Sequence, residues 1–251
     1  MILLINDDGV DHPGLRALYA ALRARLRRPV LVVVPAQQRS GQAHAITLDR
    51  ALPVTSKQDG DFFAFVVDGT PTDCVKLALT TIIPERPVLV ISGINDGANC
   101  GRSLFYSGTV GAALEAAVEG HAALAVNRDH GSGDFAAAAD LAAEVAHWLI
   151  GRGDYRGKVV NLNVPAGDSE RWLPLQVASH GHSGFRESYT PVREGREWRL
   201  HGDWVAAPDD GDSDAHLLSR GHPVLTLLRP DLNDDQEHLR RLVQRRMAKT
   251  P

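Results

Sequence analysis

Two adjacent acidic residues, Asp7 and Asp8, follow a run of four apolar residues and Asn6 near the start of the chain. The apolar run, residues 2–5, has the composition of a strand buried on both faces, and Gly9 allows a turn after it. At such a bend both carboxylates can point to one place above the sheet, where they repel each other unless a proton or a cation lies between them. We therefore interpret the pair as half of a metal site. The alternative is a helix cap and a turn residue without any ligand.

Oxygen-bearing side chains in two later loops could complete a site of this kind. Ser40 follows the strand predicted at residues 30–34, and Asn95 follows the strand predicted at residues 88–91. Two carboxylates, a hydroxyl and an amide oxygen are hard ligands, which suit Mg²⁺ or Mn²⁺ better than zinc. We therefore expect one divalent cation for each subunit, held by Asp7, Asp8, Ser40 and Asn95.

The stretch Ser107-Gly108-Thr109 lies at the start of an alanine-rich helix predicted at residues 110–118. A helix start offers free backbone N–H groups, hydroxyls and the positive end of the helix dipole, all of which favour an anion. A divalent cation beside such a helix start is typical of a phosphate site. There the cation would polarise a phosphoryl oxygen and lower the pKa of a water that attacks phosphorus in line.

Alternating apolar strands and amphipathic helices predict the scaffold that positions these residues. Pro13 suits the first turn of a helix, and Thr70, Pro71 and Asp73 have the pattern of a helix start with a capping box. A doubly wound, mostly parallel sheet in the order 3-2-1-4-5 places the loops after strands 1, 2 and 4 side by side at its carboxyl edge. The strands are expected at residues 2–5, 30–34, 62–67, 88–91, 122–126 and 158–164, and the helices at 13–26, 70–79, 110–118 and 135–150.

The composition of the chain changes after Pro165, where glycine, histidine and aromatic residues are scattered among charges. Residues 180–203 are interpreted as an extended hairpin or arm, a common device in homo-oligomers. A last strand is expected at residues 224–228, followed by a terminal helix at 234–249. The prediction is therefore a Rossmann-like α/β catalytic core at residues 1–165 and an oligomerisation region at residues 166–251.

Length and charge limit the classes of function. The chain has 251 residues, of which 43% are hydrophobic and 23% charged, and its net charge of −4 argues against a general nucleic-acid or anionic-membrane binder. No apolar run approaches the roughly 18 residues of a membrane span, and no basic leader is present, which predicts a cytoplasmic protein.

Cys74 and Cys100 are expected to be buried hydrophobes. Residues 209–214 are expected to form a solvated acidic loop, with a calcium-binding loop as the alternative.

Five sequence blocks between residues 2 and 127 together resemble the SurE family, the survival protein E nucleotidases. Each block is weak alone, but five in the right order are specific. The later half is looser: residues 226–232 are similar to the family's strand before its C-terminal segment, and residues 165–223 match poorly. The blocks are Leu3–Gly14, Val34-Pro35 with Arg39–Gly41, Gly69–Val75, Ser92–Asn95 with Gly97 and Asn99, and Tyr106–Val110.

The resemblance implies a metal-dependent phosphomonoesterase, similar to acid phosphatases, that hydrolyses nucleoside 5′- and 3′-monophosphates; some members also cleave short polyphosphate. It implies that Asp7 and Asp8 are catalytic as well as metal ligands, beside Ser40 and Asn95. It also implies that the phosphate is bound by Asn99, Ser107, Gly108 and Thr109. Because the family exchanges C-terminal elements between subunits, we expect a homodimer or homotetramer, with no membrane or nucleic-acid duplex as partner.

Two other hypotheses remain open from the residues alone. An aspartyl-phosphate mechanism of the haloacid-dehalogenase type usually has a second acid two residues after the nucleophile, and here Gly9 stands two residues after Asp7. A catalytically silent nucleotide- or phosphate-binding module is compatible with the fold class, although a bare acid pair repels phosphate. His44 could donate a proton to the leaving group or be bonded only locally, and His12 is expected to serve the helix entry.

Overall fold

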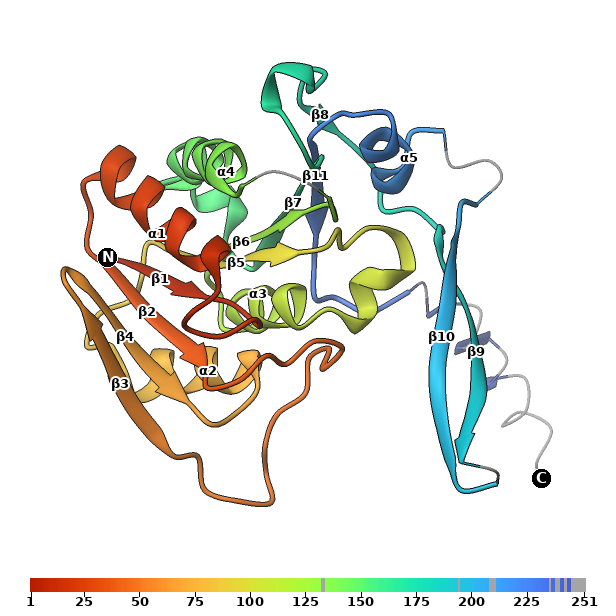
Figure 1. The fold of residues 1–251 in the computed structure, drawn as a ribbon, viewed down its shortest axis with the longest axis horizontal. Helices are drawn as coiled ribbons and strands as arrows, with labels where there is room; N and C mark the ends of the chain where they lie inside the picture. The colour runs from red at the N-terminus through yellow and green to blue at the C-terminus, as the bar shows by residue number, and fades with distance from the viewer. Residues whose placement is uncertain are drawn as a thin grey trace.

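The computed structural model of the chain describes residues 1–131, 134–193, 195–207, 211–234, 236–237, 240–241 and 243–244. Its centre is a nine-stranded sheet, and two further strands form a separate hairpin beside it (Figure 1). The strands are β1 (Ile2–Ile5), β2 (Val30–Pro35), β3 (Val54–Asp59), β4 (Phe62–Val67), β5 (Leu89–Asp96), β6 (Ala122–Arg128), β7 (Lys158–Val164), β8 (Gln176–Val177), β9 (Gly184–Arg193), β10 (Glu197–Val205) and β11 (Val224–Leu228). The sheet order is β3-β4-β2-β1-β5-β6-β7-β11-β8, and β9 pairs with β10.

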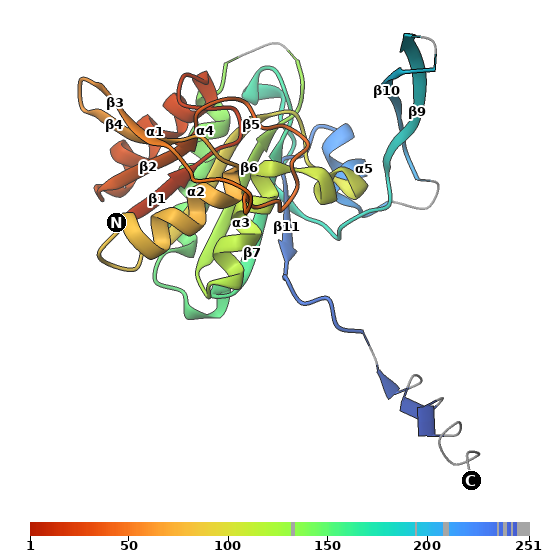
Figure 2. The same ribbon diagram turned by 90° about the horizontal axis from the view of Figure 1, so that it is seen from below.

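Helices cover both faces of this sheet (Figures 1 and 2). One face packs against α1 (Pro13–Leu26) and α4 (Ala136–Leu149), whose leucines and alanines form one hydrophobic core with the sheet. The other face packs against α2 (Pro71–Leu77) and α3 (Gly108–Val118), which form a second core. The short helix α5 (Asp214–Ser219) contacts the far end of the sheet. Because both faces are covered, β1 is buried at all four residues, as its apolar run predicted.

The predicted strand order is confirmed in the parallel part of the sheet. β1 pairs in parallel with β2 on one side, with Leu3 opposite Leu31, and with β5 on the other, with Leu3 opposite Val90. The sequence β4-β2-β1-β5-β6 therefore corresponds to the expected order 3-2-1-4-5. The loops after β1, β2 and β5 leave the same edge of the sheet, where parallel α/β sheets bind their ligands.

Some boundaries differ from the sequence prediction. The strand expected at 88–91 continues to Asp96 as β5, although its last residues are polar, because it resumes pairing with β6 after an irregularity between Ser92 and Asn95. At that irregularity Gly93 has φ 142°, and a Cβ on it would lie 2.4 Å from the carbonyl oxygen of Val126. The short or exposed strands β3 and β8 were not predicted, because they bury too little apolar surface to show a pattern. The terminal helix predicted at 234–249 falls largely outside the described residues.

The predicted arm is present as the β9–β10 hairpin, which stands away from the core sheet, while the chain after β11 runs off in another direction (Figure 2). The expectation of a solvated acidic loop is wrong for its last residue, Asp214. This carboxylate is fully buried and accepts the backbone N–H groups of Gly101, Gly181 and Ala215 at 2.8–3.2 Å. It therefore ties the polar loop after β5 to the C-terminal region. Within the described residues, no helix is long and apolar enough to cross a membrane.

Candidate metal and phosphate site

The turn after β1 is closed by a side chain, that of Asn6. Its amide N–H donates to the carbonyl oxygen of Gly9 at 2.8 Å, and its Oδ1 accepts the N–H of Gly9 at 3.2 Å. Gly9 has φ 93°, a conformation that suits glycine. Asn6 thus fixes the bend that places Asp7 and Asp8 at the carboxyl edge of the sheet.

Asp7 is buried against the start of α3, with only 3% of its surface exposed. The hydroxyl of Thr109 donates to its Oδ1 at 2.5 Å. A Cβ on Gly108 would lie 3.1 Å from both the Cβ and the Oδ2 of Asp7, so the helix start packs closely on the acid. Burial raises the pKa of Asp7 from 3.8 to about 6, although hydrogen bonds from Thr109 lower it; the nearby carboxylate of Asp8 raises it further.

Asp8 lies beside Asp7 and is joined to the loop after β2. The side-chain amide of Gln38 donates to Asp8 Oδ1 and to Ser40 Oγ, both at 3.1 Å, so one nitrogen bridges the two oxygens. The Nδ1 atom of His12 lies 3.7 Å from Asp8 Oδ2. Burial raises the pKa of Asp8, while the nearby His12 ring and the backbone N–H of Asp96 lower it. The acid therefore faces residues of all three loops predicted to meet here.

Neither carboxylate forms an ion pair with a lysine or arginine in the described part of the chain. Asp8 Oδ2 is buried and has no hydrogen-bond partner in the described part of the chain. No group of three or more His, Cys, Asp or Glu residues suited to a metal occurs among the described residues, so a cation here would need neutral oxygens as well. Two close carboxylates, one with an unsatisfied buried oxygen, are a set of ligands that suits a hard divalent cation.

Ser40 and Asn95 are the two neutral ligands predicted from the sequence. Ser40 lies in the loop after β2, and Asn95 lies near the end of β5, so they come from the two strands that flank β1. Ser40 Oγ shares the Gln38 amide with Asp8. The side-chain N–H of Asn95 donates to the carbonyl oxygen of Gly97 at 2.7 Å, and its Oδ1 accepts no hydrogen bond from the described residues. Both side chains thus have an oxygen available for a cation, and their role as ligands stays a prediction.

Three of the predicted phosphate-binding residues lie at the start of α3, and the fourth, Asn99, lies beside β6 and β7. Ser107 is the N-cap of α3, where its Oγ accepts the N–H of Val110 at 3.1 Å, so the predicted helix start is confirmed. Thr109 directs its hydroxyl to Asp7 and thereby supports the acid. Gly108 is the first residue of α3 and packs closely against Asp7, and the N–H groups of a first helical turn have no partner within the helix. Asn99 is 8% exposed and lies among buried asparagines of β6 and β7.

The histidines take local partners. His12 caps α1, with its Nδ1 accepting the N–H of Gly14 at 3.2 Å, as the helix-entry prediction required. His44 Nε2 lies 2.7 Å from Glu115 Oε2 on α3, and Lys76 donates to the other oxygen of Glu115 at 2.6 Å. His44 therefore helps to hold the loop that carries Ser40 against α3.

Sequence reasoning missed two residues that organise the site, Gln38 and Asn6. Gln38 lies in the same polar loop as Ser40, and only the spatial approach of that loop to Asp8 reveals its bridge. Asn6 precedes the acid pair directly, and an asparagine before a glycine turn is a recognised turn signal. The partnership of Thr109 with Asp7 spans 102 positions, and no local pattern could predict it.

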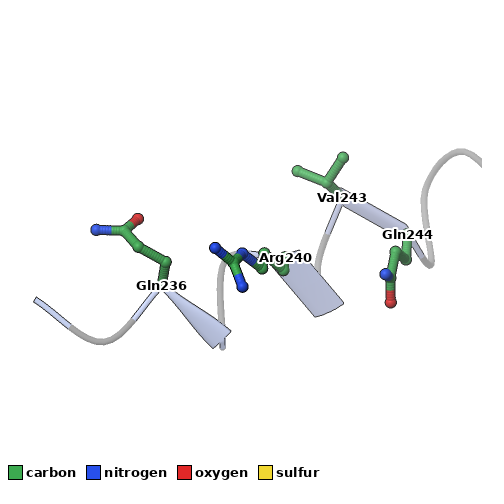
Figure 3. A pocket seen from close by; sticks show the side chains of 4 residues that line it. All are labelled: Gln236, Arg240, Val243 and Gln244. Atoms are coloured by element: carbon green, nitrogen blue, oxygen red, sulfur yellow. The ribbon is translucent and has the colours of Figure 1, made fainter.

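A surface cavity of about 500 Å³ lies elsewhere, on the C-terminal segment (Figure 3). Its described lining is Gln236, Arg240, Val243 and Gln244, all from one short stretch of chain. None of the residues predicted for the metal or the phosphate lies there. The chemistry-bearing groups are gathered instead at the carboxyl edge of the sheet.

Comparison with known proteins adds independent information about the chain. Residues 2–187 match the family described as Survival protein SurE. A 5′-nucleotidase SurE of Desulfovibrio desulfuricans is 41% identical over 244 residues, which cover 94% of this chain and 95% of that protein. A 5′-nucleotidase SurE of Symbiobacterium thermophilum is 39% identical, with coverage of 96% and 97%. The crystal structure of the SurE protein from Aquifex aeolicus superposes with a TM-score of 0.82 at 28% identity, and covers 96% of this chain and 99% of that one.

Proposed function

This chain belongs to the SurE family, and we propose that it is a 5′-nucleotidase that hydrolyses nucleoside 5′-monophosphates to nucleoside and phosphate with the help of a divalent cation. The observation that carries the proposal is the pair of buried carboxylates, Asp7 and Asp8, at the carboxyl edge of the sheet. A cation would stabilise the ionised form of Asp7, whose pKa burial raises, and would bind the Asp8 oxygen that has no hydrogen-bond partner in the described part of the chain. Relatives named 5′-nucleotidase SurE match nearly the whole chain, which supports the substrate class.

In the proposed site each residue has a distinct task. Asp7, Asp8, Ser40 and Asn95 would hold the cation, whose chemistry when bound is to polarise the phosphoryl group and to make water more acidic. Thr109 fixes the orientation of Asp7, so that carboxylate needs no rearrangement during the reaction. Gln38 holds Asp8 and Ser40 in one geometry. Such preorganisation is how hydrolases of this kind lower the barrier.

On the substrate side, the start of α3 and Asn99 would bind the phosphate. The backbone N–H of Gly108, the dipole of α3 and the Asn99 amide are donors or partial positive charges, so they favour the anion. Asp7 or Asp8 would orient the attacking water, since both carboxylates would lie beside the bound cation. His44 remains a candidate proton donor to the leaving group, bonded to Glu115 in the free enzyme.

We further propose Mg²⁺ or Mn²⁺ as the cation, one per subunit, with nucleoside 3′-monophosphates and short polyphosphate as additional substrates. A panel of these phosphates against Mg²⁺, Mn²⁺, Zn²⁺ and chelator, with released phosphate as the readout, tests the proposal. We expect turnover of nucleoside monophosphates with Mg²⁺ or Mn²⁺ and none with chelator. A protein that binds nucleotides but releases no phosphate with any metal would be the silent binding module instead.

The β9–β10 hairpin supports a proposal of homo-oligomers. Its aromatic residues Phe185, Tyr189, Trp198 and Trp204 are 45–65% exposed, in a segment that stands off the core. Exposed aromatic patches of this kind mark protein interfaces. Light scattering after size exclusion should give a dimer or tetramer, and replacing Trp198 and Tyr189 by serine should shift it toward monomer. The division at residue 165 and the cytoplasmic location stay predictions.

A further inference from the structure

Three fully buried asparagines on the adjacent strands β6 and β7 surround Asn99. Asn127 lies near the end of β6, and Asn161 and Asn163 lie on β7; none of the three has any exposed surface. The strand pairing places Asn127 opposite Asn163. Buried amides cost stability unless every polar atom is bonded, and apolar residues would serve these strands equally well. The cluster therefore has a task other than holding the sheet together.

The cluster bonds every polar part of the Asn99 backbone. The N–H of Asn99 donates to Asn163 Oδ1 at 2.8 Å. The carbonyl oxygen of Asn99 accepts the side-chain N–H groups of Asn161 at 3.0 Å and Asn163 at 3.3 Å. The loop after β5 is therefore pinned at this one residue by two side chains of β7.

The side chain of Asn99 is oriented by the third asparagine. Its Nδ2 donates to Asn127 Oδ1 at 2.7 Å, and Asn127 Nδ2 donates in turn to Asn161 Oδ1 at 2.8 Å and to the carbonyl oxygen of Leu162 at 3.0 Å. In a network made only of side-chain amides, the oxygen and nitrogen of every amide could be exchanged without losing a hydrogen bond. Here two backbone carbonyls, those of Leu162 and Asn99, can only accept, so they fix which end of each amide is the donor.

This polarity has a consequence for ligand binding. Because Asn127 must present its oxygen, Asn99 must present an N–H to it. The second N–H of Asn99 and its Oδ1 remain free of the cluster. A planar amide held in this orientation can donate its second N–H to an anion without first rotating to exchange its oxygen and nitrogen.

We propose that Asn127, Asn161 and Asn163 are positioning residues that hold the Asn99 amide with one N–H ready to donate to the substrate phosphate. The proposal rests on the proposed function, in which Asn99 binds that phosphate. The three asparagines touch no ligand themselves and act only through Asn99. Their removal should weaken phosphate binding and leave cation binding unchanged, since the metal ligands lie on other side chains.

The test measures binding of inorganic phosphate to the Mg²⁺-loaded protein by calorimetry, together with KM and kcat for a nucleoside monophosphate. We compare the wild type with Asn127→Ala, Asn99→Ala and the double variant. Asn127→Ala should weaken phosphate binding about tenfold, the fold-change of 1.4 kcal/mol, and raise KM similarly, with Mg²⁺ affinity unchanged. In the Asn99→Ala background, Asn127→Ala should have no further effect on phosphate binding, because the two residues act as one unit.

Controls separate positioning from a general loss of stability. Thr226→Val removes another buried polar group. Thr226 lies opposite Asn161 in the sheet, and its hydroxyl has no partner in the described part of the chain. It should leave phosphate affinity unchanged. Should Asn127→Ala fail to fold, Asn127→Leu fills the space of the amide without an acceptor for Asn99 and provides the same comparison.

Two results would overturn the positioning role: equal phosphate affinity in the wild type and Asn127→Ala, or effects of Asn127→Ala and Asn99→Ala that multiply in the double variant. Failure of the wild type to hydrolyse nucleotides would refute the proposed function by itself. The calorimetric comparison would still decide whether Asn127 acts through Asn99.

Discussion

Replacing Asp7 by asparagine should make the metal-free protein more stable while it abolishes catalysis. The asparagine side chain would keep an oxygen to accept the Thr109 hydroxyl, and the substitution would remove a charge that burial disfavours. The rise in the pKa of Asp7 from 3.8 to about 6 corresponds to about 3 kcal/mol of destabilisation at neutral to basic pH, at 1.36 kcal/mol for each pH unit. For a chain of this size that is a rise in Tm of roughly 6–12 °C.

The sign of the pH dependence follows from the direction of the shift. An acid whose pKa is higher in the folded state destabilises the fold fully above the folded value, about 6, and ceases to do so below the unfolded value of 3.8. The advantage of Asp7→Asn should therefore be largest near pH 8 and shrink as the pH falls through 6 toward 4. Calorimetric scans in chelator at several pH values measure it directly.

Two comparisons make this prediction specific. Asp11→Asn changes an exposed carboxylate of the same loop, which pairs with Lys57, and should alter Tm little. Added Mg²⁺ should raise the Tm of the wild type and hardly that of Asp7→Asn, because the cation stabilises only the protein that binds it. If Asp7→Asn melts below the wild type in chelator at basic pH, the argument that Asp7 is an unneutralised buried charge is wrong.

The remaining predictions concern the neighbours of the acid pair. Gln38→Ala should weaken Mg²⁺ binding roughly tenfold with little change in Tm, because Asp8 and Ser40 lose the amide that bridges them; unchanged affinity by calorimetry would contradict this. Gly111→Ala should lower Tm and Mg²⁺ affinity together, because its Cβ would lie 2.2 Å from the carbonyl oxygen of Ala43 in the loop that carries Ser40; a variant with wild-type values for both would refute it. Treatment with chelator should stop phosphate release reversibly, with recovery on adding Mg²⁺ or Mn²⁺, and full activity in chelator would exclude a metal-dependent reaction.

The parts of the fold that sequence could predict are those with a strong local pattern. β7 and β11 begin and end at the predicted residues, and the capping box of α2 at Thr70 is present as expected. The polar end of β5 was predicted as a loop, because Gly93, Asn95 and Asp96 do not have the apolar pattern of a buried strand. The edge strand β3 was missed because its residues face solvent.

The sequence motifs predicted which residues meet at the candidate site, but not the hydrogen bonds that hold these residues in place. The acid pair and the α3 start are visible as motifs, and the parallel sheet order is enough to bring their loops together. The bridge through Gln38 and the bond from Thr109 to Asp7 depend on how loops pack after the fold has formed. The asparagines of β6 and β7 resemble ordinary strand-end residues until Asn99 is seen among them.

The most direct test of the account is a crystal structure of the protein grown with Mn²⁺ and measured at the manganese absorption edge. We expect a single anomalous peak in each subunit, between the carboxylates of Asp7 and Asp8 and within coordination distance of Ser40 Oγ and Asn95 Oδ1. A map without a peak at the acid pair, or with manganese bound elsewhere in the subunit, would contradict the central claim that these two carboxylates form the metal site.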